Sequence, residues 1–195
     1  MENLKLGSYS SEESNSKITR FGHMGLLVLA FLLSIWMKEI FDLLVRNSEL
    51  ASAYTLTILI IFSYTYFPTY ALISTKLWYL EKTKLILRLT VSAAIVSIIF
   101  NNVLIPFLGI WGSAIATFAS LMYLGYAGNM IGKIKIIVKS HLRFRLMFLS
   151  TLLFLIVAYF IVLESVFVKM LVTLLVFIYA YYRQRDERII KVLQS

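Results

Sequence analysis

The chain has 195 residues, of which 60% are hydrophobic and only 15% are charged, and its mean hydropathy is +0.83. Because about a quarter of the residues of a soluble domain are charged, this composition excludes an ordinary water-soluble protein and indicates a multi-pass membrane protein. The net charge of +9 lies between apolar runs, which favours a role in membrane topology over nucleic-acid binding, and the lack of cysteine excludes disulfides and thiolate sites.

The N-terminal segment, residues 1–20, is polar. It lacks the basic start and early apolar run of a cleavable signal peptide, so we expect a cytoplasmic N-terminal segment. The first membrane span is predicted over Phe21–Met37. The following stretch, Glu39–Glu49, groups its apolar residues at helical spacing and is expected to extend this helix into the outer interface. His23 stands near the beginning of the span, where an interfacial position is expected.

The second span is predicted over Ala51–Ser74 and is the most polar. Pro68 should kink this helix, and the carbonyl groups that it frees must be met by water, hydroxyls or neighbouring helices. Tyr66 and Tyr70 are four residues apart and share a helix face. Tyrosine combines an apolar ring with a polar tip, which suits a sugar ligand in a water-filled cavity. The alternative is that these tyrosines serve the interfacial belt and helix packing.

A basic segment separates spans two and three. Its cations would attract a phosphorylated headgroup on the cytoplasmic side through charge-assisted bonds, or they serve only to orient the chain. They are Lys76, Lys82, Lys84 and Arg88.

Spans three and four are predicted from a 44-residue stretch without charge, Leu89–Gly132, since one crossing takes about 20 residues. The spans are placed at Leu85–Ile105 and Ile110–Ile131, with Pro106 and Gly109 in the outer turn. Near the end of span three, Asn101 and Asn102 are interpreted as helix caps, or one of them as facing a cavity. Small residues in span four recur at four-residue spacing and predict close helix packing; they are Gly112, Ala116, Ser120, Gly128 and Gly132.

Two further spans are predicted, over Leu146–Leu163 and Val166–Tyr182. The basic loop Lys133–Arg145 precedes them and is interpreted as a topology anchor, or as a segment that binds anionic lipid along the inner leaflet. Lys169 interrupts the last span, and near the interface it can extend its amine to water. The basic tail, residues 183–195, follows.

Lysine and arginine gather in alternate connecting segments, and positive charge is retained in the cytoplasm. We therefore predict an all-α protein of the cell membrane, with six transmembrane helices over residues 21–182 and both termini cytoplasmic.

Signals of an enzyme are lacking. His23 and His141 belong to no pattern with a carboxylate or a nucleophile, and no phosphate-binding glycine loop or metal-ligand spacing occurs. The predicted spans also place no carboxylate deep in the apolar region, where a proton- or sodium-coupled site would need one. We expect no catalytic residue, cofactor or metal.

The segment from Lys82 to Thr117, KTKLILRLTVSAAIVSIIFNNVLIPFLGIWGSAIAT, resembles the polysaccharide (O-antigen-type) flippases of the multidrug/oligosaccharidyl-lipid/polysaccharide exporter superfamily. The resemblance lies in a lysine-bearing loop, a span ending in N-x-x-L-I-P, a glycine turn and the sequence GSAIAT. The stretch Trp36–Ile40 and the tyrosine-rich span two also look like the second half of that family.

The resemblance implies one six-helix lobe of a twelve-helix flippase that moves a lipid-linked oligosaccharide on undecaprenyl pyrophosphate from the inner to the outer leaflet. The first lobe would come from another chain, or the lobe would self-associate, or the chain is a truncated half. The candidate substrate-binding residues are Tyr66, Tyr70, Lys76, Lys84, Arg88 and Asn101. Membrane lipids are expected partners, and nucleic acid is not. The alternatives are a cation-coupled multidrug exporter of the same superfamily and a membrane scaffold subunit without transport.

Overall fold

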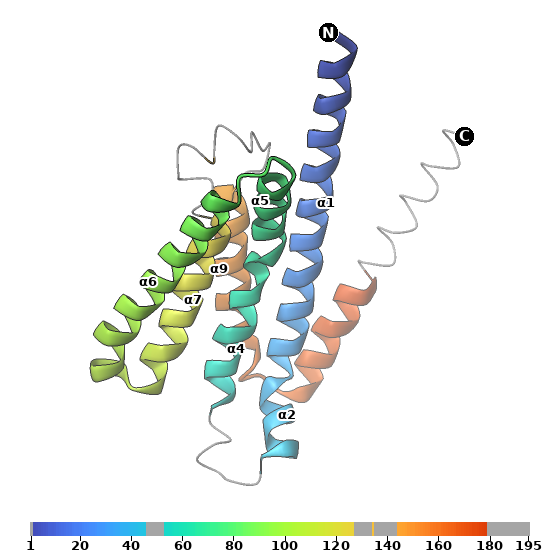
Figure 1. Cartoon of the computed structure of the whole chain (residues 1–195). Helices are drawn as coiled ribbons and strands as arrows, with labels where there is room; N and C mark the ends of the chain where they lie inside the picture. Colours follow the sequence, from blue (N-terminus) through green and yellow to red (C-terminus); the bar gives the residue numbers. More distant parts are fainter. Residues whose placement is uncertain (1, 46–52, 127–133, 135–143, 179–195) are drawn as a thin grey trace.

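The computed structural model of the chain describes residues 2–45, 53–126, 134 and 144–178, and no strand occurs within these ranges (Figure 1). The elements that it describes are helices. In chain order they are α1 (Glu2–Ile35), α2 (Met37–Leu44), α4 (Tyr54–Ser63), the 3₁₀ helix η1 (Tyr64–Tyr66), α5 (Phe67–Tyr79), α6 (Thr83–Leu108), α7 (Ile110–Tyr126), α9 (Phe144–Ile161) and a further helix, Val166–Ile178.

Four helical segments are long and apolar enough to cross a membrane: Ser14–Ile35, Tyr54–Tyr79, Thr83–Leu108 and Phe144–Ile161. They indicate a membrane-embedded, all-helical protein and confirm that part of the prediction. The count of six spans stays a prediction, because α7 has 17 described residues and Val166–Ile178 is also shorter than the other four. The basic loop near His141 and the tail lie outside the described residues, as do Gly128 and Gly132.

Helix α1 starts at Glu2, so the polar N-terminal segment is helical and continuous with the first span. Its first turns extend beyond the rest of the bundle (Figure 1). The helix breaks at Trp36, and α2 follows over Met37–Leu44. This agrees with the prediction that helix continues beyond the first span.

The centre of the bundle is a cluster of apolar side chains from α1, α2, α4, α7 and α9. The Phe31 and Phe154 rings meet edge to face, with their centroids 5.5 Å apart. The Tyr159 hydroxyl donates a hydrogen bond of 2.6 Å to the Thr55 carbonyl, which ties α9 to α4. Because apolar burial gives little advantage to helix association within lipid, such close packing and interhelical bonds are what hold the helices together.

Helices α6 and α7 form a hairpin (Figure 1). Its turn is Gly109, whose φ of +56° and ψ of −130° fall in a region that only glycine adopts readily. A Cβ atom on Gly112 would lie 2.5 Å from the carbonyl carbon of Leu104, so the small side of α7 contacts the backbone of α6. The burial of Gly112, Ala116 and Ser120 confirms the predicted close packing of this helix.

The interpretation of the asparagines as caps is wrong. Helix α6 continues to Leu108 with Pro106 inside it, so Gly109 alone makes the turn. The Asn101 and Asn102 amides donate to carbonyls four residues earlier, those of Ser97 at 2.8 Å and Ile98 at 2.9 Å. Their polar groups are thus met within the helix, which a side chain can do wherever a carbonyl lies one turn back.

Candidate functional site: a break in the second span

In its middle the second span changes from α-helix to a 3₁₀ turn and back, within one helical segment, Tyr54–Tyr79; we call this turn the break. Helix α4 ends at Ser63, the 3₁₀ turn η1 follows, and α5 starts at Phe67 with Pro68 in its first turn. Proline has no N–H to continue the preceding helix, so the chain tightens to bonds between residues three apart. The Phe67 N–H accordingly reaches the Tyr64 carbonyl. The predicted loss of a backbone donor at Pro68 thus appears as a 3₁₀ turn, while the kink stays a prediction.

Hydroxyl groups satisfy several carbonyls around the break. Ser63 donates to the Ile60 carbonyl at 2.5 Å, Thr65 to Phe62 at 2.7 Å and Thr69 to Tyr66 at 2.5 Å. The three donors are at most 1% exposed. A backbone carbonyl inside a membrane needs such a partner because water is absent. The hydroxyls thus give the carbonyls around the break a donor, in the same three-residue pattern that Ser92 forms with Leu89 in α6.

A histidine from α1 meets the carbonyl that Pro68 leaves without a donor. In a continued 3₁₀ turn, Pro68 would donate to Thr65, three residues before it, but it has no N–H. The His23 Nδ1 atom lies 3.1 Å from the Thr65 carbonyl oxygen, and because that oxygen can only accept, Nδ1 is the donor. His23 is 1% exposed, so it packs inside the bundle, and its position relative to the interface stays a prediction.

The break is enclosed by α1 and α7. On α1, a Cβ atom added to Gly22 would lie 3.6 Å from the Pro68 Cβ, in ordinary contact. On α7, a Cβ atom on Gly125 would lie 2.6 Å from the Tyr66 Cβ and 3.0 Å from the Thr69 Oγ1, closer than packed atoms can approach. Glycine at position 125 is thus what lets α7 lie against the break.

Tyr66 and Tyr70 remain neighbours, as predicted. Their ring centroids are 6.1 Å apart, with 46° between the ring planes. Both side chains are half-buried and pack against an apolar cluster that includes Ile73, Leu89 and Leu124. The pair therefore contributes to packing between α5, α6 and α7, while part of each ring stays accessible at the break.

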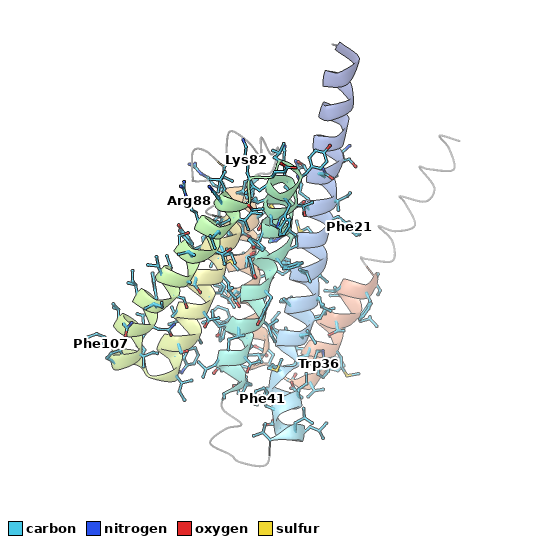
Figure 2. All side chains as sticks on the ribbon, in the orientation of Figure 1. Phe21, Trp36, Phe41, Lys82, Arg88 and Phe107 are labelled. Carbon is cyan, nitrogen blue, oxygen red and sulfur yellow. The ribbon has the colours of Figure 1, made fainter. Side chains whose placement is uncertain are left out.

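The predicted cations gather at one end of the bundle. Lys82, Lys84 and Arg88 are exposed around the turn between α5 and α6, and Lys76 is half-buried. Figure 2 shows Lys82 and Arg88 at this end, with Phe41 and Phe107 toward the other. Asn101 is not among them, because 13 residues of helix place it about 20 Å along α6 from Arg88.

A second polar contact joins α2 to the last described helix. The Lys169 Nζ lies 2.5 Å from Glu39 Oε1, and the Lys169 side chain has no exposed surface. Next to it, the Trp36 indole donates to the Thr173 hydroxyl at 3.1 Å. Lys169 therefore forms a buried ion pair instead of extending to water. Sequence spacing missed this contact because its two charges are 130 residues apart.

Within the described ranges, no group of three or more His, Cys, Asp or Glu side chains could hold a metal ion. No family model, curated protein or solved structure matches the chain. Its function must therefore be inferred from the break, the tyrosine pair and the charged end.

Proposed function

We propose that this chain is a component of a transporter that moves a lipid-linked oligosaccharide from the inner to the outer leaflet of the cell membrane. The observation that supports it best is the break in the second span, enclosed by α1 and α7. Discontinuous membrane helices with a proline or glycine interruption are typical of the substrate sites of secondary transporters, near the middle of the bilayer.

The side chains around the break suit a sugar. Tyr66 and Tyr70 offer ring faces for the apolar side of a pyranose and hydroxyls for its rim, and their rings are adjacent. The Phe62 and Tyr66 carbonyls already accept hydrogen bonds from the Thr65 and Thr69 hydroxyls. A sugar ligand would have to compete with these bonds but with few others.

The end of the bundle that carries the exposed cations suits the diphosphate of such a substrate. Lys82, Lys84 and Arg88 lie where α5 turns into α6, on the side that the charge distribution predicts to be cytoplasmic. A diphosphate headgroup arriving from the inner leaflet would bind there first, because charge-assisted bonds to phosphate oxygens are strong. The sugar would then lie toward the break.

A two-lobed pathway needs a second set of helices. A partner chain, a further segment of a longer polypeptide or a second copy of this chain could supply it. In each case the two lobes would rock against each other around the substrate, exposing the site to one leaflet and then to the other.

Complementation tests this function. In a bacterium that lacks its O-antigen flippase, the chain is expressed alone and together with the first lobe of a flippase, and surface polysaccharide is measured. We expect restoration in at least one case, and about a fivefold to tenfold loss on replacing Tyr66 and Tyr70 with leucine, the effect of roughly 1–1.4 kcal/mol. Tyr79→Leu, at an exposed tyrosine of the same helix, is the matched control.

Three results would contradict the proposal. The first is a lack of restoration under both conditions when the chain is present in the membrane. Drug efflux without polysaccharide export would favour the multidrug exporter. Capture of a glycosyltransferase or polymerase, without movement of lipid-linked sugar in liposomes, would favour the scaffold subunit.

A further inference from the structure

His23 and Tyr126 each carry a buried polar atom that lacks a hydrogen-bond partner: the Nε2 of His23 and the hydroxyl of Tyr126. Such groups are rare in folded proteins, and each calls for an explanation. These two come from different helices, α1 and α7, and both lie against the first turns of α9. The backbone of Met147 is next to His23, and the Thr151 hydroxyl is next to Tyr126, in each case without a well-aligned bond.

The hydrogen bonds already present define the state of the imidazole. Because Nδ1 donates to Thr65, a neutral ring has its single proton on Nδ1 and a bare Nε2. A second proton would turn Nε2 into a donor, and the Met147 backbone next to the ring offers it a carbonyl acceptor. That carbonyl now accepts from the Ser150 hydroxyl at 2.7 Å and the Thr151 hydroxyl at 3.0 Å.

We propose that His23 Nε2 is a proton-binding site that couples the break in the second span to α9. On binding a proton, the ring donates to Thr65 on one side and to Met147 on the other. The Thr151 hydroxyl then turns from Met147 to the unpartnered Tyr126 hydroxyl. One proton thereby adds hydrogen bonds between α1, η1, α9 and α7 to the packing of α1 against α9 that is already present.

The surroundings of His23 make its protonation depend on this geometry. Among the described residues, no ion pair joins His23 to a carboxylate. On α1 the nearest acid in the sequence is Glu13, ten residues before His23, or about 15 Å along the helix. An imidazolium without a counter-ion needs carbonyl acceptors at both nitrogens, so the proton is retained only while α9 lies against α1.

Two buried hydroxyl residues lie on α1 between its N-terminal end and His23. Ser16 and Thr19 share the face of α1 that carries His23, and both are buried, at 3% and 6% exposure. Arg20, one turn from His23, is exposed. A proton entering at the predicted cytoplasmic end would pass these hydroxyls before it reached the imidazole.

The full chain in lipid nanodiscs provides the test, and it needs no substrate, so its outcome is independent of the proposed function. In a His141→Gln background, imidazole nitrogen NMR follows His23 between about pH 5 and 8, where histidine ordinarily titrates. Hydrogen exchange of the amides in residues 144–151 is measured over the same range. We expect one protonation step, with exchange at these amides slowing at least about threefold as the proton binds.

Three variants distinguish proton binding at His23 from a role of these side chains in packing alone. Tyr126→Phe removes the acceptor for Thr151 and should shift the midpoint of the His23 titration, whereas Tyr123→Phe on the same helix should not. His23→Gln keeps a donor for Thr65 but cannot titrate, so the exchange should lose its pH dependence. An imidazole that keeps one protonation state throughout this range, or exchange that changes equally in His23→Gln, would overturn the proposal.

Discussion

Glycines of this chain differ in what surrounds them. Gly112 contacts the backbone of α6, which cannot move aside, whereas a Cβ atom on Gly25 would meet nothing within 4 Å. Because forcing a methyl group into a packed contact costs about 1–3 kcal/mol, we predict that Gly112→Ala lowers the free energy of unfolding by that amount. Gly25→Ala should leave it unchanged or slightly raised.

Denaturant titration of the two variants in mixed micelles measures this difference. Equal stability of Gly112→Ala and Gly25→Ala would show that the close approach of α7 to α6 is not maintained in the membrane protein.

The ion pair between Glu39 and Lys169 makes a second prediction at the scale of residues. Glu39→Gln leaves the Lys169 charge buried and unpaired, and removing one partner of a buried pair costs about 3–5 kcal/mol. We expect the lower end of that range, because the Glu39 side chain is 30% exposed. Asp42→Asn, at an exposed acid of the same helix, should have little effect.

The double variant Glu39→Gln with Lys169→Met removes both charges and should regain most of the lost stability. The same unfolding measurement checks it. A double variant no more stable than Glu39→Gln alone would mean that the unpaired charge is not what destabilises the protein.

At the scale of elements, the break in the second span sets a test of how α1 and α5 cooperate. Pro68→Ala supplies an N–H three residues after Thr65, so the carbonyl no longer depends on His23. We predict that His23→Phe costs about 1–3 kcal/mol in the natural background, the effect of leaving a buried acceptor unsatisfied, and clearly less in Pro68→Ala.

A double-mutant cycle on unfolding free energies measures this coupling. Independent, additive effects of the two substitutions would contradict the role of His23 as the replacement donor.

The elements also show what local patterns can and cannot predict. Pro68 predicted the interruption because proline lacks a donor whatever its surroundings are. The same reasoning placed Pro106 in a turn, whereas it lies inside α6. After Pro106 the helix continues for only two residues, to Leu108, so the missing N–H of Pro106 removes few helical hydrogen bonds. At Pro68 a full helix follows and the break must be repaired.

For the whole molecule, the distribution of basic residues predicts which end faces the cytoplasm. The chain has no cysteine, so single cysteines report position without interference. We expect Lys82→Cys, in the turn before α6, to be shielded from a membrane-impermeant maleimide in intact cells. Phe107→Cys, at the other end of α6 (Figure 2), should react.

Permeabilised cells provide the control, in which both cysteines should be labelled. Labelling of Lys82→Cys in intact cells, with Phe107→Cys protected, would invert the predicted topology and remove the cytoplasmic entrance from the proposed function.

Composition and local chemistry by themselves determined that this protein is helical and membrane-embedded, which stretches form its apolar helices, and that Pro68 removes a backbone donor within one of them. These properties follow from helix length, hydropathy and the missing N–H of proline, which act between near neighbours. The first apolar helix begins at Ser14, seven residues before the predicted Phe21. The tertiary structure alone decided the partners: His23 for Thr65, and Glu39 for Lys169. Those pairings depend on which helix faces meet, and a polar side chain in a membrane is satisfied by whichever group the packing brings to it.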